Sequence, residues 1–129
     1  MNSGYWKRTT TKEWAGLNYI EAILDFDDLP EHTYGKLKVE WADDSPEQPG
    51  EHEIEVRLSY QQQVGVKVPF VGSNIRKRVS KRWQLDKSEW FKIPPECKGM
   101  ACLWVEGRCI DGGQCAVALA TVALEQRDE

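Results

Sequence analysis

The chain has 129 residues and a mass of 14.8 kDa, the usual size of one domain with a substantial core. Apolar residues make up 40% and charged residues 29%, a balance typical of globular proteins rather than disordered ones. The longest apolar run, Cys115 to Leu124, is too short to cross a bilayer as a helix. We therefore expect a single domain over residues 1–129 and no membrane association.

Charge is unevenly distributed along the chain, whose formal net charge is −4. Seven residues between Glu40 and Glu55 are acidic and none is Lys or Arg, whereas five residues between Arg76 and Arg82 are basic and none is acidic. Because the rest of the molecule is strongly acidic and repels polyanions, nucleic acid could bind only at the basic segment.

The N-terminal quarter contains two expected strands. The first covers residues 4–11. Residues 10–24 fit two interpretations, because the segment opens with a capping-box pattern and apolar residues at helical spacing, while its second half alternates as a strand does. We favour a strand over 18–26.

Three strands with a period of two follow, over residues 35–42, 52–61 and 63–70. In each, apolar residues alternate with polar ones, which is typical of an antiparallel strand buried on one face. Pro69 indicates that the third is an edge strand or contains a bulge.

The remaining expected strands cover residues 75–85, 89–93, 100–110 and 114–125. The alanine-rich segment 115–127 could also form a helix. Small and large residues alternate in it, however, and an Asp-Gly-Gly turn precedes it, which favours the second arm of a hairpin buried on both faces.

Eight or nine short antiparallel strands predict an all-β domain, either a closed barrel or two packed sheets. The connecting loops have uneven lengths, which suits Greek-key or jelly-roll-like crossovers better than an up-and-down barrel. We expect an antiparallel β-sandwich. No motif in the chain identifies a family.

Four cysteines (Cys97, Cys102, Cys109 and Cys115) lie near the C-terminus without the C-x2-C spacing typical of zinc sites. We expect free thiols and no bound metal or cofactor, with disulfides and a metal site as alternatives. A short loop could bring Cys109 close to Cys115. The first residues contain no hydrophobic stretch, so we expect no secretory signal and a cytoplasmic location.

Catalytic residues are not predicted. His32 and His52 are expected to be solvated, and the sequence has neither a Gly-x-Ser-x-Gly elbow nor a phosphate-binding loop. The acidic turn residues are interpreted as solvated rather than calcium-binding; they are Asp25, Asp27, Asp28, Asp43 and Asp44. The sequence therefore favours a protein that is not an enzyme.

Six tryptophans provide candidate binding residues. By the alternation of their strands, Trp41 and Trp83 are expected in the core, and at most one of Trp90 and Phe91 is buried. Trp104 should face away from its apolar neighbours on the strand. An exposed indole can stack on a sugar ring or on a partner's apolar side chain, and the alternative is burial under a second layer or a subunit.

The basic segment is interpreted as one strand, with Arg76, Arg78 and Arg82 on the same face. This face either protects a sheet edge, docks onto the acidic segment within the chain or across a subunit boundary, or binds nucleic acid.

We expect a non-catalytic binding or assembly module that acts through protein–protein contacts and self-associates. The predicted partner-binding residues are Arg76, Arg78, Arg82, Trp90 and Trp104. The alternatives are a carbohydrate-binding module that uses Trp90 or Trp104, and a nucleic-acid binder that uses residues 76–82.

Overall fold

The computed structural model describes residues 6–21, 33–45, 51–63, 66–94, 102–111 and 114–128, which form ten β-strands. The strands are β1 (Trp6–Thr11), β2 (Ala15–Glu21), β3 (Thr33–Asp43), β4 (His52–Gln63), β5 (Val66–Pro69), β6 (Ile75–Val79), β7 (Gln84–Lys87), β8 (Phe91–Lys92), β9 (Cys102–Cys109) and β10 (Gln114–Asp128). Over these ranges the chain contains no helix capable of crossing a membrane.

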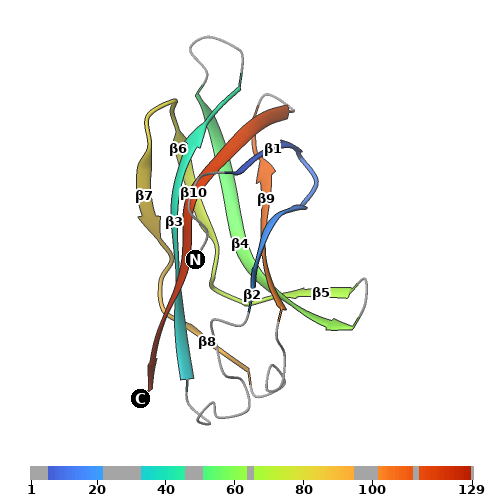
Figure 1. Ribbon diagram of the computed structural model, residues 1–129, viewed down its shortest axis with the longest axis vertical. Helices are drawn as coiled ribbons and strands as arrows, with labels where there is room; N and C mark the ends of the chain where they lie inside the picture. The colour runs from blue at the N-terminus through green and yellow to red at the C-terminus, as the bar shows by residue number, and fades with distance from the viewer. Residues whose placement is uncertain are drawn as a thin grey trace.

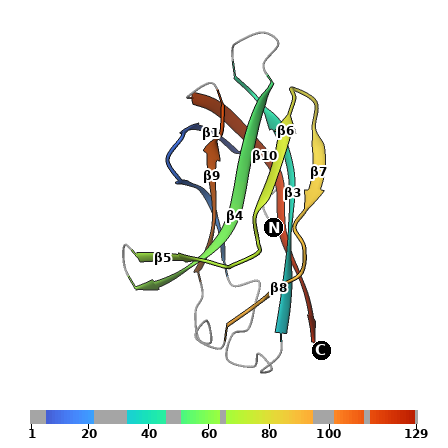
Figure 2. The same cartoon turned by 180° about the vertical axis from the view of Figure 1, so that it is seen from behind.

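The strands form two antiparallel sheets that pack face to face (Figure 1). The β3 sheet has the order β1-β10-β3-β7, with β8 also paired to β3. The β4 sheet has the order β2-β9-β4-β5, with β6 also paired to β4. The reverse view shows the same two layers (Figure 2). The predicted β-sandwich is confirmed.

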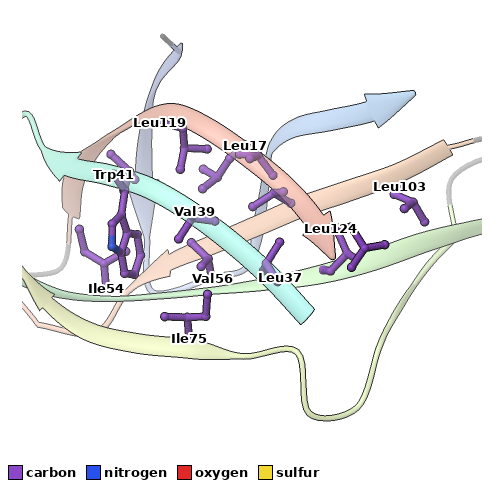
Figure 3. Packing of buried hydrophobic residues seen from close by; sticks show 14 of the residues in the cluster. Leu17, Leu37, Val39, Trp41, Ile54, Val56, Ile75, Leu103, Leu119 and Leu124 are labelled. Carbon is purple, nitrogen blue, oxygen red and sulfur yellow. The ribbon is translucent and has the colours of Figure 1, made fainter. Parts of the chain in front are cut away.

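The core lies between the two sheets and follows the alternation seen in the sequence. Leu37, Val39 and Trp41 on β3 are fully buried and face Ile54 and Val56 on β4 (Figure 3). A fully buried side chain of this size stabilises the fold by roughly 1.5–3 kcal/mol. Packing of the two inner faces therefore holds the sheets together.

The prediction of one strand over residues 75–85 is wrong. Residues 75–79 form β6 on the β4 sheet, and residues 84–87 form β7 on the β3 sheet, so the segment crosses from one sheet to the other. Alternation does not extend through the crossover. Trp83 consequently lies outside the core, with 46% of its surface exposed, and Arg82 does not share a strand with Arg76 and Arg78.

The C-terminal segment is a strand, as predicted, but it is not the second arm of a hairpin. β10 pairs with β1 and β3, whereas β9 belongs to the other sheet. Its residues 115–119 are buried on both faces, as expected. The helical alternative for 10–24 is also excluded over the described residues, because 6–11 and 15–21 are strands; residues 22–26 lie outside them.

Cys109 and Cys115 lie on opposite sheets and face one another in the core as free thiols, which confirms the expectation for these two residues. The Cys109 thiol donates a hydrogen bond to the carbonyl oxygen of Asp111 at 2.7 Å, and the Thr10 hydroxyl lies 3.4 Å from the Cys115 sulfur. Burial raises the pKa of both thiols. Cys97 and the side chain of Cys102 are outside the described residues.

Because only thiolates react with alkylating reagents, we expect Cys109 and Cys115 to resist iodoacetamide in the native protein at pH 8 and to react fully in urea. Peptide mapping by mass spectrometry measures each cysteine separately. Since folding raises the two pKa values, stability should be constant below the ordinary thiol pKa of about 8.5 and decrease as pH rises above it. Rapid native alkylation of either residue would contradict this description.

Candidate functional site

The outward surface of the β4 sheet carries four charged side chains, two uncharged polar ones and a tryptophan, which together we call the outer polar face: Glu55, Arg57, Ser59 and Gln61 on β4, and Trp104, Glu106 and Arg108 on β9. These residues alternate with core residues, so they point away from the other sheet. Glu106 is nevertheless only 7% exposed, and Ser59 is fully buried. Glu55, Ser59 and Glu106 are thus shielded from water, whereas the other four side chains of the face are partly exposed.

Pairing across the two strands neutralises these charges. Arg108 donates to Glu55 at 2.7 and 2.9 Å, and Arg57 donates to Glu106 at 3.1 Å. Ser59 donates a further hydrogen bond to Glu106. Among the residues that the structure describes, every buried side-chain nitrogen or oxygen has a hydrogen-bond partner. The cross-strand register produces this arrangement, because it places Glu55 opposite Arg108 and Arg57 opposite Glu106.

Trp14, just before β2, packs on this face. The Arg57 and Arg108 guanidinium groups lie 4.0 and 4.6 Å from its ring centroid, within the range of cation–π contacts. The indole therefore holds both guanidinium groups in place. Sequence reasoning missed Trp14 as a site residue, because its neighbours come from strands distant in sequence.

Trp104 lies further along the same face and is half-buried, pointing outward as predicted. Its Nε1 donates to Gln61 Oε1 at 3.0 Å, and Lys67 Nζ lies 4.2 Å from the ring centroid. Gly16 on β2 leaves the space that both groups occupy, since a Cβ there would lie 3.4 Å from the indole and 2.9 Å from Lys67 Nζ. The Gln61 amide thus fixes the Trp104 ring at its N–H edge, and the long, exposed Lys67 side chain covers the face of the ring.

The shape of the sheet explains how Lys67 reaches this position. The end of β4 and the short strand β5 project from the body of the sandwich (Figures 1 and 2). β5 is an edge strand, as Pro69 indicated, and the β4–β5 register shifts between Gln61 and Gln63. This projecting end of the sheet brings Lys67 beside Trp104 and Gly16.

Trp90 belongs to a different surface from Trp104. Lys36 of β3 and Arg127 of β10 lie 4.8 and 4.4 Å from its ring centroid, so Trp90 contacts the β3 sheet. It is half-buried while Phe91 is buried, which confirms that only one of the two enters the core. The two predicted aromatic residues therefore cannot form one platform.

The basic segment pairs with acidic residues of its own chain. Arg76 contacts Glu53 at 2.8 Å, and Arg78 contacts Glu51 at 2.8 Å and Asp111 at 3.2 Å. The hydrogen bond that the Arg76 guanidinium donates to the Glu53 carboxylate raises the pKa of Arg76. The Arg76–Glu53 pair joins edge strand β6 to β4, and Arg78 contacts the residues just before β4 and just after β9. Intrachain docking therefore accounts for part of the complementary charge. A role of Arg76, Arg78 and Arg82 in partner binding stays a prediction.

The expectation of a solvated His52 is wrong. Its Nδ1 lies 2.5 Å from Asp43 Oδ2, and the Asp43 side chain is fully buried although it was expected to be solvated. Asp43 also accepts a hydrogen bond from the backbone N–H of Ser45 at 2.9 Å. This pair fixes the end of β3 against the start of β4.

The described residues contain no cluster of three or more histidine, cysteine or acidic side chains placed to hold a metal ion. Asp44 is exposed, as expected for a turn residue. His32, Asp25, Asp27 and Asp28 lie outside the described residues.

No known protein family and no curated protein sequence matches the chain. Solved structures do resemble it. A CBM4 structure (a carbohydrate-binding module) is 11% identical with a TM-score of 0.54, and the match covers 98% of this chain and 74% of that one. A Stig cyclase from Fischerella sp. TAU, solved with a pyrrolidinylidene-indole, is 14% identical with a TM-score of 0.56, and the match covers 89% of this chain and 57% of that one.

A second structure of a cyclase from Fischerella sp. TAU, in complex with 4-(1H-indol-3-yl)butan-2-one, is 15% identical with a TM-score of 0.55. The chain spans little more than half of these cyclase chains. At such low identity the likeness concerns the fold alone. The chain shares a β-sandwich fold with the CBM4 structure and with the cyclase structures.

Proposed function

We propose that this domain is a non-catalytic carbohydrate-binding module and that its site is the outer polar face around Trp104. The observation that carries the proposal is an outward-facing indole beside hydrogen-bonding side chains, on the face of a sheet. The resemblance to a CBM4 structure supports it at the level of fold.

A sugar ring has an apolar C–H face and a polar edge of hydroxyl groups, and the site offers a partner for each. The Trp104 indole supplies a flat apolar surface held in place by Gln61. Lys67 covers this surface, but its side chain is long and exposed, so a sugar ring can displace the ammonium group into water. Beside the indole, the partly exposed Gln61 and Arg57 side chains provide hydrogen-bonding groups for hydroxyls.

The charge balance of the face favours a neutral glycan. Both carboxylates, Glu55 and Glu106, are already paired with arginines, so neither offers an unpaired charge to an ionic ligand. Binding of neutral hydroxyl groups leaves these ion pairs intact.

This proposal places carbohydrate binding, one of two alternatives drawn from the sequence, above the protein–protein contacts that the sequence favoured. Self-association was expected partly from the aromatic residues of the C-terminal strands and partly from the complementary charges of the acidic and basic segments. Some of these charges are paired within the chain, at Arg76–Glu53 and Arg78–Glu51. Self-association and a cytoplasmic location stay predictions, the first of which light scattering at low and high salt would test.

Affinity electrophoresis through gels with neutral polysaccharides built from glucose, xylose, mannose or galactose tests the proposal. We expect at least one polysaccharide to retard the parent protein, and Trp104→Ala to lose about tenfold or more in affinity because the stacking surface is removed. Trp90→Ala, on the opposite sheet, is the matched control and should bind like the parent.

Circular dichroism establishes that each variant is folded, and Gln61→Ala provides a second, milder change at the same indole. Retention of full affinity by Trp104→Ala and Gln61→Ala would overturn the proposal, as would failure of every polysaccharide to retard the parent.

A further inference from the structure

A pocket of about 250 Å³ lies on the other sheet, next to the exposed Trp83. It is lined by Ala42, Asp43, Asp44, Lys81, Trp83 and Ala118. None of the sequence-based hypotheses placed a site here, because Trp83 was expected in the core.

The floor of the pocket follows from the pairing of β3 with β10. Ala42 and Ala118 are register partners, next to the core pair Trp41 and Leu119. Because successive residues of a strand point to opposite faces, the two alanines face outward, and their small side chains leave a hollow. The chain that crosses from β6 to β7 brings the Trp83 indole to the rim of this hollow.

Hydrogen bonds fix the backbone around the rim. The backbone N–H of Asp43 donates to the carbonyl oxygen of Ser80 at 2.8 Å, and Lys81 Nζ donates to the carbonyl oxygen of Ser45 at 2.5 Å. Asp44 donates from its backbone N–H to the carbonyl oxygen of Ala116 at 2.8 Å. The crossover is thereby tied to the ends of β3 and β10, so the pocket is formed before any ligand arrives.

We propose that this pocket is a second carbohydrate site, which binds a single sugar ring independently of Trp104. Its volume is below the roughly 300–1,000 Å³ of pockets for drug-sized ligands, which limits the occupant to about one ring. The indole and the two alanine methyl groups contact the apolar face of the ring. Lys81 and Asp44 place opposite charges at the rim, which suits hydroxyl groups better than an ion of either sign.

The inference extends the proposed function to the β3 sheet, and a long glycan that reached both sheets would bind with higher avidity than either site provides. A test must therefore separate the two sites. Methyl glycosides of glucose, xylose, mannose and galactose each offer only one ring, and the Trp104→Ala variant retains only the pocket.

The experiment is a fluorescence titration of Trp104→Ala with each methyl glycoside up to about 100 mM, a range that detects millimolar affinity. At least one glycoside should produce a saturable change in tryptophan emission. The change should disappear in the double variant Trp104→Ala/Trp83→Ala. Leu85→Ala in the same background, an exposed apolar residue of β7 outside the pocket, should leave the change intact.

The inference is overturned if no glycoside changes the emission of Trp104→Ala, or if the change persists without Trp83. Neither result affects the site at Trp104, which the polysaccharide gels test separately. Conversely, unaltered polysaccharide binding by Trp104→Ala together with a Trp83-dependent change would refute the outer polar face and support the pocket.

Discussion

Replacing Trp41 by alanine is expected to lower the free energy of unfolding by about 3–5 kcal/mol, the usual cost of removing a fully buried large aromatic side chain. Trp41 has no exposed surface, and its indole reaches across the core toward the β4 sheet (Figure 3). Its Nε1 also donates to Asp86 Oδ2 at 2.6 Å, so the substitution removes a hydrogen bond to a charged group. Urea denaturation measures the loss.

Trp83→Ala is the matched control, because the sequence predicted both tryptophans in the core and the structure separates them. With nearly half of its surface exposed, Trp83 should contribute about 1 kcal/mol or less. If Trp41→Ala does not yield folded protein, Trp41→Phe keeps most of the ring and should lose a smaller amount. Equal losses for Trp41→Ala and Trp83→Ala would contradict the described core.

The second large effect concerns the ion pair on the outer polar face. Arg57→Met should destabilise the fold by about 2–3 kcal/mol, because among the described residues it leaves the buried Glu106 carboxylate with Ser59 as its one side-chain hydrogen-bond donor. Adding Glu106→Leu removes the unpaired carboxylate and should recover part of the lost free energy of unfolding. The double variant should therefore be more stable than the sum of the two single changes predicts.

The same urea denaturation series measures this double-mutant cycle. Arg76→Met serves as the control, since the Arg76–Glu53 pair is solvent-exposed and its loss should change stability little. Additive effects of Arg57→Met and Glu106→Leu would show that the two groups do not interact as described.

The sequence predicted most strands correctly because a period of two is a local property. Leu37, Val39 and Trp41 alternate with charged residues and are all in the core. The same reasoning failed for residues 75–85, where Val79, Trp83 and Leu85 share one parity in the sequence although the chain crosses from one sheet to the other at residues 80–83. A pattern of side chains does not reveal which sheet receives the next strand.

Candidate site residues were predictable only in part, for the same reason. The outward direction of Trp104 follows from its neighbours on β9. The proximity of Trp14 to Arg57 and Arg108 depends on the register of three strands, which local patterns do not determine. The burial of Asp43 was likewise missed, because its partner His52 lies on the next strand and not in the same turn.

The central claim is that the outer polar face binds a neutral glycan. An NMR titration that follows the tryptophan indole N–H signals tests this claim most directly. The chain has six tryptophans, each with one such signal, and Trp→Phe variants assign them. The ligand is a short oligosaccharide of the polysaccharide that retards the protein. Saturable shifts of the Trp104 and Trp14 signals, with the buried Trp41 signal unchanged, are the predicted result. Unmoved Trp104 and Trp14 signals at saturating ligand would contradict the claim.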